Sequence, residues 1–176
     1  MAKLVLLGGA AGVGKTTITQ RYLNENPLTL GIEGDVIIAM MGQWIDYEDA
    51  ARELLFELTK CMVATHLKAG RDVVLPYLVT DVSHVEAFEK IANESGARFI
   101  EVALMADKDE AIRRIFERGT WGEPGTPPLT KNDLPIVERL YDAMTAELKK
   151  RPGTIIIPAI RGDVETTYSQ FCAATK

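Results

Sequence analysis

The sequence predicts a three-layer α/β protein, with a five-stranded parallel sheet between helices on both faces. Two observations indicate this fold. Short apolar, strand-like runs alternate with helix-like segments along the whole chain, which is typical of right-handed βαβ units. The first apolar run also leads directly into a glycine-rich phosphate-binding motif. We therefore expect residues 1–176 to form a single domain, with one long loop serving as a mobile lid.

Five segments are expected to be strands. The first is wholly apolar, as a central strand buried on both faces should be. The expected strands are Leu4–Leu7, Leu28–Ile32, Asp72–Val79, Phe99–Met105 and Thr154–Ile157.

The segments between these strands carry helix start and stop signals. Asp46 is expected as an N-cap, Gly70 as a stop, and Ser83 with Glu86 as a capping box. The expected helices are Lys15–Asn24, 46–69, 83–96, 107–119, Asp133–Lys150 and Asp163–Ala173.

Residues 119–132 are expected to form a loop, because they contain three glycines and three prolines. A connection of 14 residues is longer than compact domains usually need, and such loops are usually functional or mobile. We interpret residues 113–132, the loop and the end of the preceding helix, as a lid.

Composition excludes several classes of protein. The chain has 20 basic and 25 acidic residues, a net charge of −5 that argues against binding nucleic acid through its phosphates. No apolar run approaches the ~18 residues needed to cross a membrane. Cys61 and Cys172 are far apart and lack metal-ligand spacing, so we expect two free thiols and a cytoplasmic protein.

The most specific signal is residues 9–16, Gly-Ala-Ala-Gly-Val-Gly-Lys-Thr, which match G-x-x-x-x-G-K-[ST] at every fixed position. Glycines let successive backbone N–H groups point at phosphate oxygens, and the following helix adds its positive dipole end. We expect Lys15 to contact the β- and γ-phosphates of ATP, and the Thr16 hydroxyl to bind Mg²⁺. The residues expected to bind the nucleotide here are Gly9, Ala10, Ala11, Gly12, Val13, Gly14, Lys15, Thr16 and Thr17.

A guanine-reading GTPase is disfavoured. Residues 130–133, Thr-Lys-Asn-Asp, match [NT]-K-x-D, but they follow a Pro/Gly loop instead of a buried strand. No D-x-x-G sequence occurs in the chain. A helix start with Asn132 or Asp133 as cap explains this segment better.

An acidic pair follows the second expected strand, in Gly31-Ile32-Glu33-Gly34-Asp35. In parallel sheets ligands bind at the carboxyl ends of strands, and a phosphotransferase needs a carboxylate there to accept or orient the acceptor's proton. Asp35 is the first candidate for this catalytic role and Glu33 the second. A purely structural alternative is that Asp35 caps a short helix at Val36–Met41.

These motifs, together with Asp-Val-Val-Leu in the third strand, make the chain resemble the small P-loop kinases. That group includes gluconate, shikimate and nucleoside monophosphate kinases, antibiotic phosphotransferases and the kinase domain of polynucleotide kinase. The resemblance implies a sheet order of 2-3-1-4-5, ATP with Mg²⁺ as cofactors, and a lid that carries arginines. Arg113, Arg114 and Arg118 lie where the family carries them, and Arg161 lies where it often packs the adenine ring.

Arg114 and Arg118, Arg118 first, are expected to offset the charge of the transferred phosphoryl group. The structural alternative is an exposed helix face on which Glu110 and Glu117 pair with these arginines.

One departure from the family concerns the metal. Related kinases often end the third strand with an aspartate that orders the Mg²⁺ shell, whereas this chain has Pro76. Asp35 is then expected to take a larger share of metal binding, or Asp81 to approach from the next loop. Asp72 lies at the strand's start, at the opposite edge of the sheet.

The charged residues between Asn24 and Gly70 narrow the chemical class of the acceptor. Between Asn24 and Gly70 the chain has three basic and eight acidic residues, whereas an anionic acceptor favours arginines in bidentate geometry. We therefore predict transfer of the ATP γ-phosphate to a small neutral or cationic hydroxyl compound, with Gln43, Trp44 and Tyr77 as possible pocket residues. The alternatives are a nucleotide or polynucleotide 5′-kinase and a nucleotide-dependent regulatory module.

Overall fold

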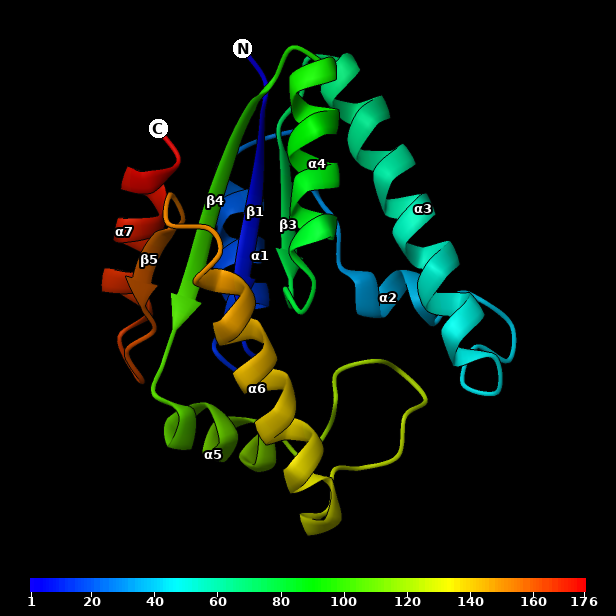
Figure 1. The fold of residues 1–176 in the computed structure, drawn as a ribbon. Helices are drawn as coiled ribbons and strands as arrows, with labels where there is room; N and C mark the ends of the chain where they lie inside the picture. Colours follow the sequence, from blue (N-terminus) through cyan, green and yellow to red (C-terminus); the bar gives the residue numbers. More distant parts are fainter.

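The computed structural model describes all 176 residues, and its five strands form one parallel sheet in the order β2-β3-β1-β4-β5 (Figure 1). The predicted fold and strand order are confirmed. The strands are β1 Lys3–Gly9, β2 Leu30–Gly31, β3 Val73–Tyr77, β4 Arg98–Met105 and β5 Ile155–Pro158. The helices are α1 Lys15–Glu25, α2 Gly34–Ile38, α3 Glu48–Lys68, α4 Val82–Glu94, α5 Lys108–Arg118, α6 Leu134–Leu148 and α7 Val164–Ala174.

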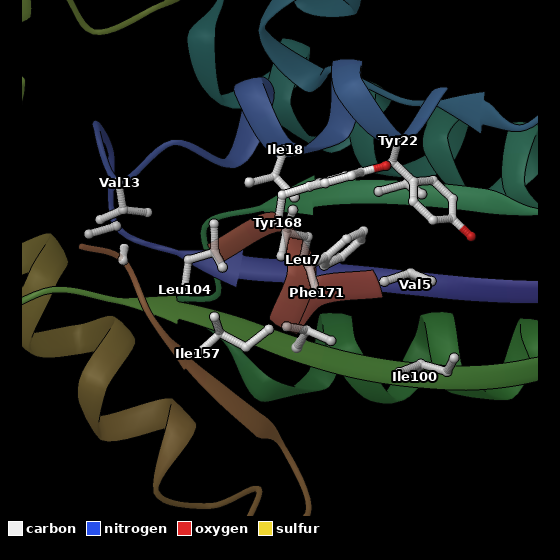
Figure 2. Packing of buried hydrophobic residues seen from close by; sticks show 14 of the residues in the cluster. Val5, Leu7, Val13, Ile18, Tyr22, Ile100, Leu104, Ile157, Tyr168 and Phe171 are labelled. Carbon is white, nitrogen blue, oxygen red and sulfur yellow. The ribbon is translucent and has the colours of Figure 1, made fainter. Parts of the chain in front are cut away.

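The central strand β1 organises two hydrophobic cores. Val5 and Leu7 face one side of the sheet, where they pack with α1 and α7 (Figure 2). Leu4 and Leu6 face the other side, where they pack with α3 and α4. All four side chains are completely buried. Burying each contributes about 1.5–3 kcal/mol, so β1 and the loop that follows it are firmly held in the sheet.

Three sequence predictions were wrong in detail. The second strand covers Leu30–Gly31 only, because it is an edge strand that pairs with β3 alone. Helix α3 begins after Tyr47, and Asp46 lies in the preceding turn, where its N–H donates to the Gln43 carbonyl. Helix α4 is capped by Asp81, whose carboxylate accepts from the Ser83 N–H, and not by Ser83.

Two other expectations from the sequence, a helix start and two free cysteines, are confirmed. Thr130 and Asp133 form a capping box through which the chain enters α6, so the Thr-Lys-Asn-Asp segment is a helix start. Cys61 and Cys172 are free thiols. None of the helices combines the length and the apolar character that crossing a membrane requires.

A largely buried ion-pair network links the segment before β5 to strand β4 and helix α4. Arg151, between α6 and β5, donates from Nε to Glu101 of β4 at 2.9 Å and from Nη2 to Glu89 of α4 at 2.7 Å. The Glu101 side chain is only 8% exposed, so water cannot replace the guanidinium if it is lost.

Replacing Arg151 by Ala should therefore lower the free energy of unfolding by about 1–3 kcal/mol, because a buried carboxylate is left without a partner. Urea denaturation measures this loss. Arg98→Ala, at an exposed position on the same strand as Glu101, is the control and should cost much less. Equal losses in the two variants would contradict a structural role for the network.

Candidate functional site

The phosphate-binding motif forms a tight loop between β1 and α1. Gly9, Gly12 and Gly14 all have positive φ angles, of 143°, 80° and 101°. A Cβ on Gly9 would lie 2.7 Å from the Leu104 carbonyl oxygen, so only glycine fits there. Gly14 begins α1, and no side chain caps that helix. Its first N–H groups are thus left free for an anion, as phosphate binding at a helix N-terminus requires.

Lys15 lies folded against this loop. Its Nζ donates to the carbonyl oxygens of Gly9 at 2.8 Å and Ala10 at 3.0 Å. Burial lowers the pKa of the ammonium from 10.5 to about 8, opposed by the attraction of Asp35 and reinforced by the repulsion of Arg118. The ammonium is therefore a desolvated cation, which interacts strongly with any phosphate that enters the loop.

The acidic pair lies beside Lys15 at the start of α2. The Thr16 hydroxyl donates to Glu33 Oε2 at 3.3 Å, and Glu33 Oε1 is buried without a hydrogen-bond partner. Burial raises the pKa of Asp35, while Lys15, Arg118 and Arg52 oppose that rise. Glu33 is the N-cap residue of α2 but makes no side-chain cap, and Asp35 lies in its first turn.

These oxygens match the ligands that Mg²⁺ prefers. The Thr16 hydroxyl and the unpartnered Glu33 oxygen lie together next to the phosphate loop, and hydroxyl and carboxylate groups are suitable magnesium ligands. The chain has no cluster of three or more His, Cys, Asp or Glu side chains suited to a metal. A magnesium ion here would therefore depend on nucleotide phosphates for its remaining ligands, as is usual for this ion.

The other carboxylates considered from the sequence are used elsewhere. Asp81 caps α4. Asp72 accepts from the Lys3 N–H at the amino end of β1, at the opposite edge of the sheet, as expected. Pro76 pairs in register with Leu7 and has no metal-binding group. Glu33, the second candidate from the sequence, is the carboxylate that contacts Thr16.

The structure places the three predicted lid arginines in different surroundings. Arg118 lies near Lys15 and Asp35, and both of their pKa values respond to its charge. Arg114 is largely buried one turn earlier on α5, where it donates to Glu110 and to the Ala159 carbonyl. Arg113, on the exposed side, pairs with Glu110 and Glu117.

Arg114 instead lines a pocket of about 160 Å³ next to the phosphate loop. Its walls come from Gly12–Gly14, the start of α1 and residues 159–164 between β5 and α7. Arg161 belongs to this pocket and forms an ion pair with Glu117 at 3.0 Å. This is the position at which the sequence resemblance led us to expect the adenine ring.

The 119–132 loop contacts Asp35. A Cβ on Gly122 would lie 2.7 Å from Asp35 Oδ2. Two residues that sequence reasoning did not assign to the site also meet here: Arg52 of α3 and Glu123 of the loop form an ion pair at 3.0 Å. No sequence pattern indicates this contact, because the partners are 71 positions apart.

The aromatic candidates have mainly structural surroundings. Trp44 is buried with Ile38 and Ala51 in a small cluster between α2 and α3. Tyr77, at the carboxyl end of β3, forms a 2.6 Å hydrogen bond with His84, and burial raises its pKa to about 12.

The same fold occurs in solved kinases. A gluconokinase from Sinorhizobium meliloti 1021 superposes with a TM-score of 0.64 at 14% identity, covering 99% of this chain and 91% of that chain. A sugar kinase from Janibacter sp. HTCC2649 superposes with a TM-score of 0.68 at 14% identity, and the match covers 99% of this chain and 95% of that chain. A chain of the Pnkp1/Rnl/Hen1 RNA repair complex superposes with a TM-score of 0.66 at 15% identity, and the match covers 86% of this chain and 47% of that chain. At these identities the likeness shows the fold alone.

Sequence comparison identifies the family. No curated protein matches the chain. Residues 4–131, which include the phosphate loop, the acidic pair and most of the loop over Asp35, match a family model described as an AAA domain. Because this match spans well over half of the chain, the chain belongs to this AAA-domain family, and its fold is the P-loop kinase fold.

Proposed function

We propose that this protein is a kinase that transfers the γ-phosphate of ATP to a hydroxyl group of a small acceptor. The observation that carries the proposal is the position of the Asp35 carboxylate, which lies beside Lys15 and Arg118 next to the phosphate loop. A phosphotransferase needs a carboxylate there to accept the acceptor's proton.

Each group has a role in the proposed transfer. The N–H groups of residues 9–17 and the Lys15 ammonium hold the phosphates, while the 159–164 segment with Arg161 holds the base. Asp35 accepts the proton of the acceptor hydroxyl as its oxygen bonds to the γ-phosphorus. The bond from that phosphorus to the β–γ bridging oxygen breaks, and ADP leaves. Arg118 offsets the negative charge that spreads over the transferred group.

Magnesium fits this site. Thr16 and Glu33 would hold the ion, with Asp35 close enough in sequence and space to share in its binding. When bound, Mg²⁺ neutralises charge on the β- and γ-phosphate oxygens.

The charges around Asp35 support a neutral or cationic acceptor. Arg52 is the only arginine between Asn24 and Gly70, and it is already neutralised by two carboxylates, Glu48 at 2.7 Å and Glu123 at 3.0 Å. An anionic acceptor would have to compete with both. The sugar kinase fold supports a polyhydroxylated compound such as a sugar.

A polynucleotide 5′-kinase is the second candidate, favoured by the similarity to a chain of an RNA repair complex. The net charge of −5 speaks against it. Measuring Mg²⁺-dependent ATP consumption with sugars, nucleosides, mononucleotides, antibiotics and a 5′-hydroxyl oligonucleotide separates these classes. Stimulation by a mononucleotide or the oligonucleotide alone would refute the charge argument. ATP binding with no stimulation by any acceptor would favour a regulatory module.

Asp35→Asn should lower the rate of transfer about 10²–10⁴-fold, because the amide cannot accept a proton, and leave ATP affinity nearly unchanged. Lys15→Ala should weaken ATP binding and abolish transfer. Single-turnover transfer and ATP titrations measure the two effects. Asp46→Asn, the same change at a nearby exposed position, is the control. Unchanged turnover in Asp35→Asn would remove the assignment of the base.

Glu33→Gln should raise the Mg²⁺ concentration needed for half-maximal transfer about tenfold, because the amide is a weaker ligand than a carboxylate. Titrating activity with Mg²⁺ at saturating ATP measures this requirement. Asp81→Asn should leave it unchanged, since Asp81 caps α4. A Mg²⁺ requirement that shifts in Asp81→Asn and not in Glu33→Gln would reverse the assignment.

Burial of the Lys15 ammonium also lowers the free energy of unfolding. Its pKa is about 8 in the folded chain, below the usual 10.5, so at pH 7 folding must bury a charged ammonium. A cation with a lowered folded pKa destabilises the fold at low pH. That penalty disappears as the pH rises from about 8 toward 10.5, where the folded chain releases the proton first.

Without nucleotide, Lys15→Met should therefore raise the free energy of unfolding at pH 7 by about 1–3 kcal/mol, and the gain should shrink above pH 8. Denaturant titrations at pH 7, 8 and 9.5 measure this trend. Lys131→Met, at an exposed position, should show no such gain. A Lys15→Met variant that is less stable than the parent at pH 7 would contradict the burial cost.

A further inference from the structure

We infer that Arg52 and Glu123 form a latch that holds residues 119–132 closed over Asp35 and thereby positions the Arg118 guanidinium. Both are positioning residues and neither touches the reacting atoms. The catalytic consequence rests on the proposed function, whereas the closure of the loop does not.

The ion pair is the direct contact between the loop and α3. Arg52 Nη2 lies 3.0 Å from Glu123 Oε1. Glu123 is only 13% exposed, although its neighbours Gly122 and Pro124 are exposed. Arg52 is oriented by Glu48 one turn earlier on the same helix, which accepts from Arg52 Nε at 2.8 Å. The guanidinium therefore approaches Glu123 already aligned.

The loop carries this constraint to Arg118. Arg118 Nε donates to the Thr120 carbonyl at 2.9 Å, and its Nη2 donates to the Trp121 carbonyl at 2.6 Å. Gly122, the next residue, packs against Asp35, and Gly125 packs against Ile45. The segment that holds the Arg118 guanidinium thus ends at the residue that Arg52 binds. Moving Glu123 away would move the carbonyl groups that fix Arg118.

Electrostatics explains why the latch depends on both partners. Burial raises the pKa of Glu123, and the nearby charges of Asp35 and Glu48 raise it further, while Arg52 opposes them. Without Arg52, the Glu123 carboxylate would face two carboxylates in a partly desolvated position, and the loop would open. Without Glu123, Arg52 would keep Glu48 as a partner, but nothing charged would link it to the loop.

The closed loop contacts Asp35 through Gly122, while Asp35 itself stays exposed to solvent. Loosening the latch should therefore act on the reaction by disordering Arg118. We therefore expect a lower kcat for the acceptor reaction with an unchanged KM for ATP, whose binding residues lie on the other side of the phosphate loop.

The first test measures loop closure and requires no activity. The chain has two tryptophans: Trp121 lies in the loop, half-buried, and Trp44 is buried in the α2–α3 cluster. Acrylamide quenching should rise in Glu123→Gln and Arg52→Glu, because Trp121 becomes accessible. The rise should vanish when the same changes are made with Trp121→Phe. In Glu57→Gln, a change elsewhere on α3, acrylamide quenching should equal that of the parent protein.

The second test uses charge reversal. The double variant Arg52→Glu/Glu123→Arg should restore quenching toward the parent value, since opposite charges again face each other across the contact. For transfer, each single variant should lower kcat about three- to tenfold, and the double variant should recover most of that loss. The KM for ATP should not change in any of them.

The outcomes separate the two claims. Quenching that is unchanged in both single variants, or that the double variant does not restore, overturns the latch. Quenching that follows the expected pattern in a protein that phosphorylates no acceptor supports the latch and refutes the proposed function. Transfer that is lowered equally in the single and double variants refutes the positioning of Arg118.

Discussion

The complete burial of β1 is the constraint on which the site depends. Because Leu4–Leu7 pack into hydrophobic cores on both faces of the sheet, the strand ends at a fixed position between β3 and β4. The glycine loop turns there, so α1 starts with its free N–H groups at the carboxyl edge of the sheet. The acidic pair, which follows the edge strand β2, meets the loop at this same edge.

At that edge the chain gathers opposite charges in a partly desolvated space. Lys15 and Arg118 face Asp35, while Arg52 lies between Glu48 and Glu123. Each cation moderates the burial cost of a carboxylate, and the pKa shifts of Lys15 and Asp35 express what remains of that cost. Such a site is less stable alone than with phosphates bound, because the ligand's charge and oxygens satisfy the groups that the protein leaves unpaired.

Local patterns in the sequence were sufficient for the phosphate loop and for most helix starts. The Gly-x-x-x-x-Gly-Lys-Thr motif acts through backbone geometry over eight neighbouring residues, so no distant contact is needed to recognise it. The exact caps of α3 and α4 were missed because several polar residues compete at each start. There Tyr47 and Asp81, and not Asp46 and Ser83, take the N-cap position. The second strand was predicted too long. It lies at the edge of the sheet and pairs only with β3, at Leu30 and Gly31, so few backbone hydrogen bonds hold its ends in strand conformation.

By itself, the sequence determined the fold class, the strand order through its family resemblance, and the candidate groups Lys15, Thr16, Glu33 and Asp35. These follow from hydrophobic patterning and from motifs confined to short stretches of chain. Only the tertiary structure decided which groups meet: Glu33 with Thr16, Arg118 with Asp35, Arg114 with the pocket beside the phosphate loop, and Arg52 with Glu123. Such contacts join residues far apart in the sequence, and they depend on how helices and loops pack over the sheet, which no local pattern encodes.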